Sequence, residues 1–129
     1  MPFNKLHVPQ DLDPGTCQKI NQELHDALVE TCAVNPEDFF CLVCRYAPQD
    51  MIFHPTFLGV RDPAATIVIE IALLSGRTEA QKEALYADVR LRLDKIGFPS
   101  GNSIMFLLEN SPLDWSFSAE GSVKRVLKL

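Results

Sequence analysis

The spacing of apolar residues predicts a long amphipathic helix near the start of the chain. Between Cys17 and Leu28, apolar side chains recur at every third or fourth position, which is the period of one helix face. Asp13 is a typical N-cap, and Pro14 suits the first helical turn because the donor that it lacks would be unpaired there anyway. We therefore expect a helix over residues 14–32.

A second apolar stripe predicts another helix in the second half of the chain. This stripe runs from Leu85 to Ile96 with the same helical spacing. Thr78 and Gln81 stand three positions apart just before it, which is the pattern of a capping box at a helix start. Gly97 follows the last apolar position and is placed to end the helix.

Short apolar runs beside these helices predict strands over residues 3–8, 38–46, 65–74 and 103–109. The run 65–74 is almost continuously apolar, as in a strand that is buried on both faces. The connection 47–63 contains several prolines and a glycine, and we expect a short hairpin in it around residues 51–60.

The order strand–helix–strand occurs twice and predicts an α/β (α+β) fold. We expect a single domain over residues 1–129, with one βαβ unit at about 1–60 and a second at about 61–129. A right-handed crossover makes the strands of each unit a parallel pair, so both helices cover one face of a four-stranded sheet. The strands are too apolar to leave the other face in water, and we expect an oligomer that packs its sheets inward.

Composition and charge exclude several classes of protein. The chain has 129 residues, of which 47% are hydrophobic and 22% charged, as in an ordinary globular domain. A formal net charge of -5 gives no basic footprint for nucleic acid. No apolar run approaches the roughly 20 residues of a membrane span, and no signal peptide is apparent. We therefore expect no membrane or nucleic-acid partner and a cytoplasmic location.

The four cysteines do not form a convincing metal or disulfide pattern. Cys41 and Cys44 make a Cys-x-x-Cys pair, but in a strand their side chains would point to opposite faces. No second pair with zinc-ligand spacing exists, and the histidines show no ligand spacing either. We interpret Cys17, Cys32 and the pair as small buried hydrophobes, and we predict no metal site.

Four motifs together resemble the tautomerase superfamily, and within it the branch close to malonate semialdehyde decarboxylase. The resemblance covers essentially the whole chain. It depends on Met1-Pro2 before the first strand, Pro-Glu-Asp-Phe at 36–39, Gly-Arg-Thr-Glu-Ala-Gln-Lys at 76–82, and Glu-Asn at 109–110 followed by Asp-Trp-Ser-Phe at 114–117.

The resemblance implies a homotrimer that needs no cofactor and acts as a keto–enol tautomerase on small 2-oxo acids or their enols. It further implies that Pro2, freed by removal of Met1, is the general base. A free α-amino group titrates near 8, and an apolar environment or a nearby cation favours its neutral form, which can accept a proton from a substrate.

Arg77 and Asp38 are the other catalytic candidates that the resemblance implies. Arg77 lies at the junction of a strand and a helix, where a guanidinium can bind a carboxylate through two parallel hydrogen bonds. Asp38 matches an acidic position that assists the proline and activates water in the decarboxylase branch. Its presence keeps open the alternative of malonate semialdehyde decarboxylase or hydratase activity.

The chain departs from the decarboxylase pattern at Ser75, where that branch has the first of two arginines. Ser75 therefore stands at a substrate-binding position without the positive charge, which puts strict decarboxylase or hydratase activity in doubt. Arg45 and Arg61 are the candidates to compensate for the missing cation.

Three aromatic residues are candidates for the walls of the site. Trp115 and Phe117 would exclude water from the amine, and Phe39 is a weaker candidate for the same role. Packing in the core or at an interface explains these aromatics equally well.

A third alternative for the function is a non-catalytic oligomeric binding protein on the same fold, which retention of Met1 would favour.

Overall fold

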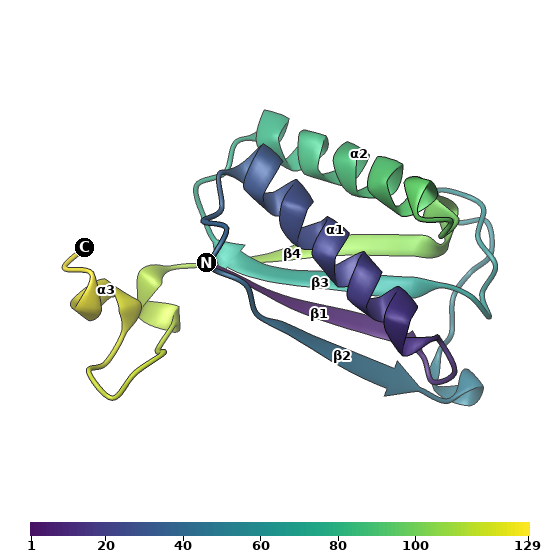
Figure 1. Ribbon diagram of the computed structural model, residues 1–129, viewed down its shortest axis with the longest axis horizontal. Coiled ribbons are helices and arrows are strands. Elements are labelled where there is room, and N and C mark those ends of the chain that lie inside the picture. The colour runs from purple at the N-terminus through teal and green to yellow at the C-terminus, as the bar shows by residue number, and fades with distance from the viewer.

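The computed structural model describes residues 1–129 and contains one four-stranded sheet with the strand order β2-β1-β3-β4 (Figure 1). The strands are β1 (Pro2–Pro9), β2 (Cys41–Tyr46), β3 (Ile67–Leu74) and β4 (Ser103–Asn110), and the helices are α1 (Pro14–Cys32), α2 (Glu79–Lys95) and the short α3 (Val123–Val126). Single 3-10 turns occur at Pro48–Asp50, Ser100–Asn102 and Pro112–Asp114.

The pairing of the strands confirms the expected tandem βαβ fold. β1 pairs with β2 in parallel, β3 pairs with β4 in parallel, and β1 and β3 are antiparallel neighbours at the centre. The long helices α1 and α2 both lie on one face of the sheet (Figure 1). The two units therefore meet along their first strands, and each crossover helix covers its own half of the sheet.

The helix boundaries follow from capping groups that the sequence already contained. The Asp13 carboxylate accepts a hydrogen bond from the Thr16 amide at 3.0 Å and begins α1. Thr78 and Gln81 form the predicted capping box at the start of α2. Past the end of α2, Gly97 adopts a φ of 85°, a left-handed conformation that glycine reaches without steric cost.

The expected hairpin around residues 51–60 is wrong, because this connection is an irregular loop without strands. The guanidinium of Arg61 donates to the carbonyl oxygens of His54 and Phe57, so a side chain satisfies acceptors that a hairpin would pair with a second strand. Pro55 also removes one backbone donor from the segment. The second strand is shorter than predicted too, because a turn closed by the Asp38 amide and the Asn35 carbonyl precedes it.

The core lies between the helices and one face of the sheet. On the central strands the inward residues alternate with half-exposed ones, and the fully buried side chains include Leu6, Ile69 and Ile71. The expectation that residues 65–74 are buried on both faces fails for the single chain, because no helix covers the second side of β3.

The uncovered face of the sheet exposes large apolar side chains. Strand register places Leu42 of β2, Phe106 and Leu108 of β4 on the side away from the helices. Each of these three side chains is between 40% and 51% exposed in the single chain. They lie on the two edge strands, and the register places Lys5 of β1 and Glu70 of β3 between Leu42 and Phe106. Large apolar side chains exposed on an uncovered sheet face are typical of an interaction site.

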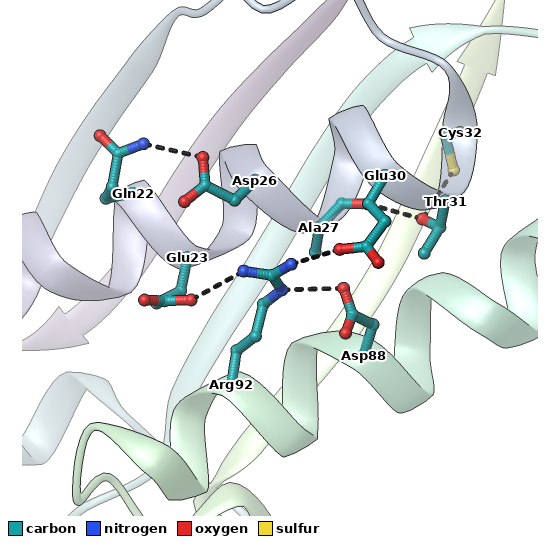
Figure 2. Close-up of polar contacts among 9 residues, drawn as sticks. All are labelled: Gln22, Glu23, Asp26, Ala27, Glu30, Thr31, Cys32, Asp88 and Arg92. Carbon is teal, nitrogen blue, oxygen red and sulfur yellow. Dashed lines mark hydrogen bonds and ion pairs between the residues drawn. The ribbon is translucent and has the colours of Figure 1, made fainter.

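A cluster of charges joins the outer sides of α1 and α2. Arg92 of α2 contacts three carboxylates, at 3.1 Å from Glu23, 2.6 Å from Glu30 and 2.8 Å from Asp88 (Figure 2). The hydrogen bond that Arg92 donates to the Asp88 carboxylate is the largest cause that raises the pKa of Arg92 above its usual value. One cation therefore fixes the two helices to each other above the core.

The last residues extend beyond the sheet. After β4 the chain continues past the end of the sheet at which β1 begins, and α3 lies out there near the chain start (Figure 1). The Val123 amide donates to the Trp115 carbonyl at 2.8 Å, which folds this segment back on itself. None of the helices combines the length and apolar character needed to cross a bilayer.

Candidate active site

The chain start, the end of α1 and the C-terminal segment converge at one end of the sheet (Figure 1). Pro2 is buried and pairs with Leu73, the second-last residue of β3. Leu74 in turn pairs with Asn110, the last residue of β4. The first residues of the chain therefore lie where β3 and β4 end, next to the segments that the sequence motifs supply.

A cavity of about 380 Å³ opens beside the chain start. Asp38 supplies the one acidic side chain of its lining, and most of the remainder is apolar. The lining residues are Met1, Asp38, Phe40, Phe117, Ser118, Gly121, Val123, Val126 and Leu127. Its size and its mixture of apolar walls with one charged group are typical of small-molecule sites.

The amino group of the chain and the carboxylate of Asp38 face each other in this cavity. The nitrogen of Met1 lies 3.2 Å from Oδ2 of Asp38, and both side chains are mostly shielded from solvent. A turn places the aspartate, since Asn35 accepts hydrogen bonds from the amides of Glu37 and Asp38, each at 2.9 Å. Only three covalent bonds separate the nitrogens of Met1 and Pro2, so the proline nitrogen lies within about 4 Å of the amine.

Phe40 and Phe117 form an aromatic wall of the cavity and belong to a longer row of packed rings. The ring of Phe117 lies 5.2 Å from that of Phe40 and is stacked at 5.7 Å on Trp115. Phe40 is stacked in turn on Phe3 of β1 at 6.1 Å. Offset stacking at these distances is favourable beyond simple burial, so the wall is a packed unit.

Phe39 does not line the cavity, and the neighbouring Phe40 does. The ring of Phe39 packs on that of His25 in α1, at 5.1 Å between centroids. Consecutive residues in an extended segment point to opposite sides, so only one of the two phenylalanines can face the aspartate. Sequence reasoning chose Phe39 from the motif, and nothing in the sequence indicated which of the pair faces inward.

Trp115 lines a second and smaller cavity of about 240 Å³ on the uncovered face of the sheet. Its indole nitrogen donates a hydrogen bond to the side-chain oxygen of Asn110, at the end of β4. Trp115 and Phe117 are stacked on each other, and Phe117 lines the larger cavity while Trp115 lines the smaller one.

Arg77 lies at the same end of the sheet but is not part of the lining of the larger cavity. Its Nε donates to the Cys32 carbonyl at 3.3 Å, and its Nη1 donates to the Leu74 carbonyl at 3.2 Å. The guanidinium thereby joins the end of α1 to the end of β3, while Nη2 has no protein partner. Ser75 is exposed, and its amide donates to the Asn110 carbonyl at 2.8 Å.

Neither candidate for a compensating cation reaches this cavity within the chain. Arg45 donates to the carbonyl oxygens of Gln10 and Leu12, and the guanidinium of Arg61 is held by the loop after β2. Both contacts lie toward the opposite end of the sheet from Pro2. Within the single chain, no arginine or lysine side chain lines the cavity that holds Asp38 and the Met1 amine.

Two of the sequence motifs meet in an ion pair beside the site. Lys82 of α2 contacts the carboxylate of Glu109 at the end of β4. The hydrogen bond to Glu109 raises the pKa of Lys82 above its usual value. Nearby, hydrogen bonds from the backbone and the hydroxyl of Ser111 lower the pKa of Asp114. These charges are paired locally, which leaves Asp38 as the acidic group that faces the cavity.

Sequence reasoning missed the C-terminal wall of the cavity. Val123, Val126 and Leu127 lie far along the chain from Asp38, and a four-residue helix carries too short a pattern to be recognised. No cluster of three histidine, cysteine or acidic side chains in the chain is arranged to hold a metal ion.

Comparisons of sequence relate the chain to tautomerases. The family model described as tautomerase enzyme matches residues 38–118. The probable tautomerase YusQ of Bacillus subtilis (strain 168) is 28% identical over 118 residues, which cover 91% of this chain and 93% of the relative. The probable tautomerase YrdN of the same organism is 27% identical over 118 residues, covering 91% of each.

Solved structures resemble the chain over almost its full length. FG41 malonate semialdehyde decarboxylase inhibited by 3-bromopropiolate is 29% identical, with a TM-score of 0.86 over 98% of this chain and 95% of that one. A fused 4-OT described as a symmetric trimer has a TM-score of 0.77 at 19% identity over 96% of this chain and 98% of that one, a likeness of fold alone.

Proposed function

Because the chain belongs to the tautomerase family, in the branch of malonate semialdehyde decarboxylase, we propose that it interconverts the keto and enol forms of small 2-oxo acids. The protein is an enzyme of this superfamily, and the proposal concerns its substrate class and its catalytic groups. Pro2, freed by removal of Met1, is the general base, and no cofactor takes part.

The observation that carries the proposal is the ion pair between the chain's amino group and Asp38 beside an apolar cavity. After removal of Met1, the nearest amine to this carboxylate is the secondary amine of Pro2. A neutral amine at that position takes the proton from the enol hydroxyl, and the ammonium that results gives a proton to the adjacent carbon. Asp38 stabilises the ammonium between the two transfers.

The substrate class follows from the shape and charge of the site. Phe40, Phe117 and Leu127 surround the amine with apolar surface, which suits the hydrocarbon part of a 2-oxo acid. The free Nη2 of Arg77 is the proposed partner of the substrate carboxylate, with Ser75 beside it. This role requires the Arg77 side chain to turn from its backbone contacts toward the cavity.

The test is ketonisation of phenylpyruvate enol by the mature protein, by Pro2→Ala, and by a protein whose chain start is extended by one residue. We expect the extension to abolish activity, because it converts the proline amine into an amide that cannot accept a proton. Pro2→Ala should lower kcat by about tenfold or more, within the range of general acid–base catalysis. Equal rates in all three proteins would refute the proline mechanism. Mass spectrometry of the protein from its own host determines whether Met1 is removed.

A second candidate activity is decarboxylation or hydration of a three-carbon oxo acid at the same site. It is favoured by Asp38, which can activate water, and by the similarity to FG41 malonate semialdehyde decarboxylase. Ser75 stands where the decarboxylase branch has the first of two arginines, and this difference weighs against the activity. A second cation there would stabilise the negative charge that develops on the substrate during the reaction. Carbon dioxide release from malonate semialdehyde no faster than background would exclude this activity.

We further propose that the protein is a homotrimer. The uncovered sheet face exposes Leu42, Phe106 and Leu108, and the same apolar face of another copy of the chain would suit it as a partner. The fused 4-OT structures that share this fold are described as trimers. Burying this face against other copies would remove the apolar surface from water. Light scattering should give three times the chain mass of 14.4 kDa, and a monomer at micromolar concentration would overturn the proposal.

A further inference from the structure

A further cavity, of about 480 Å³, lies at the opposite end of the sheet from the chain start. It is bounded by the loop after β2, by α2 and by the first residues of β4. Six of its lining residues are apolar, namely Ile52, Phe53, Phe57, Leu58, Ile104 and Met105. Its volume is in the range of small-ligand sites, and the proposed tautomerase reaction uses none of its residues.

Two arginines line this cavity without a carboxylate partner. Neither Arg61 nor Arg90 has an acidic group within ion-pairing distance, whereas Arg92, two positions further along α2, contacts three. Arg90 uses one bond, from Nη2 to the Ser103 carbonyl at 3.2 Å, so its Nε and Nη1 remain without a protein partner. Two uncompensated positive charges against apolar walls favour an anion with a hydrocarbon body.

His54 adds a third donor to the same cavity. Its Nδ1 accepts a hydrogen bond from the Thr56 amide at 3.1 Å, so the neutral ring carries its proton on Nε2. This donor can point at an oxygen atom of a ligand. The unpaired polar groups of the His54, Arg61 and Arg90 side chains are therefore donors, while the Ser103 hydroxyl already donates to the Ser100 carbonyl.

Hydrogen bonds within the loop that carries His54 and Arg61 hold its backbone together. Arg61 donates from Nη1 to the His54 carbonyl at 2.5 Å and from Nη2 to the Phe57 carbonyl at 2.7 Å, and its amide donates to the Pro55 carbonyl at 2.9 Å. Leu58 adopts a φ of 49°, a left-handed conformation that costs a leucine about 1 kcal/mol. Strained backbone held by its surroundings is typical of ligand-binding loops.

We propose that this cavity binds a small carboxylate with an aryl or branched alkyl group, separately from the tautomerase site. The carboxylate pairs with the free edge of Arg90 and with the outer hydrogens of Arg61, and His54 donates to one of its oxygens. The hydrocarbon part packs against Phe57, Met105 and their apolar neighbours. The site is a second place at which the protein recognises an organic acid.

The test is a titration of the whole protein with sodium phenylacetate. The readout is NMR of 13C-labelled isoleucine and methionine methyl groups at each ligand concentration. We expect saturable shifts at Ile52, Ile104 and Met105, which line this cavity and not the one beside Asp38. Phenylacetamide, which has the same shape without the charge, should bind at least tenfold more weakly.

Arg90→Gln should weaken the binding of phenylacetate at these methyl groups by tenfold or more, because it removes one of the two cations. Lys95→Gln removes one positive charge from the same helix outside the cavity and should leave the affinity unchanged. Arg90→Lys keeps the charge and should bind more tightly than Arg90→Gln. Equal affinity of the wild type, Arg90→Gln and the amide would overturn the proposal. Methyl shifts that follow protein concentration rather than ligand would also overturn it, and would assign the loop to a contact between copies of the chain.

Discussion

The amino nitrogen of Met1 lies 3.2 Å from Oδ2 of Asp38, although the whole of α1 separates the two residues in sequence. The contact arises because β1 and β2 are parallel neighbours, so the chain start and the turn before β2 reach the same end of the sheet. The amino group of Met1 therefore faces a carboxylate beside a largely apolar cavity.

Asp38→Asn should lower the rate of enol ketonisation by about tenfold or more, because the protonated amine loses its counter-ion. The acid limb of the pH–rate profile should also move to lower pH, since an amine without a carboxylate beside it gives up its proton more readily. Glu37→Gln changes the adjacent exposed carboxylate and should leave both rate and profile unaltered. Identical pH profiles for Asp38→Asn and the wild type would remove Asp38 from the mechanism.

Phe117→Ala should impair aromatic substrates more than small ones. The ring of Phe117 packs on Phe40 in the cavity wall and stacks on Trp115, and its loss leaves a space that water can enter. We expect KM for phenylpyruvate enol to rise several-fold, with a smaller change for pyruvate enol. Phe57→Ala, which removes an exposed ring from the opposite end of the sheet, is the matched control. A uniform loss for both substrates would indicate general unfolding instead of a specific wall.

Leu108→Glu should dissociate the oligomer. The side chain is 48% exposed on the uncovered sheet face, and burying a new charge there on assembly would cost its hydration. Light scattering should give the mass of one chain or a strongly concentration-dependent mass. Leu91→Glu introduces the same charge at an exposed position of α2 and should leave the assembly intact. Should both variants keep the wild-type mass, the sheet face is not the interface.

Arg92→Gln should lower the free energy of unfolding by about 1–2 kcal/mol. Its removal leaves Glu23, Glu30 and Asp88 close together without the cation that joins them (Figure 2). Exposed ion pairs are individually weak, but a partly buried three-way network exceeds a single pair. Urea denaturation measures the loss, and Arg125→Gln, which breaks no ion pair, should change stability little. A loss in Arg92→Gln no larger than in the control would show that the network contributes nothing.

The stability of the protein should fall as pH rises from about 9 to about 11, in part because of Cys41. Burial raises the pKa of this thiol from 9.0 to about 11, so the unfolded chain loses the proton first and the folded chain retains it. Between these values the unfolded state binds fewer protons, and unfolding becomes more favourable as pH increases. Urea denaturation at several pH values should show this slope in the wild type and in Cys44→Ala. Cys41→Ala should have a shallower slope, and an unchanged slope would exclude the thiol as its source.

Local features of the fold could be predicted because nearby residues determine them. The range of α1, the capping box of Thr78 and Gln81, and the end of α2 just before Gly97 each depend on groups within one helical turn. The hairpin expected at 51–60 failed for the opposite reason. Its conformation depends on the Arg61 side chain, whose contacts with backbone carbonyls leave no mark in the apolar pattern.

The candidate site was predictable only in part. Motifs directed attention to Asp38 and Phe117, which the fold brings to one cavity, and to Arg77, which the fold uses to join α1 to β3. Phe40 was not distinguished from Phe39, because the direction of a side chain in a short extended segment depends on what the segment packs against.

The two long helices, the four strands and their parallel pairing could be predicted from the sequence, because periodicity, caps and crossover handedness are local or nearly local properties. Which side chains meet at the chain start could not be predicted in this way. The cavity combines Met1, Asp38 and Leu127, residues from the beginning, the first third and the end of the chain. Long-range contacts of this kind come from packing in three dimensions, which no pattern along one stretch of sequence encodes.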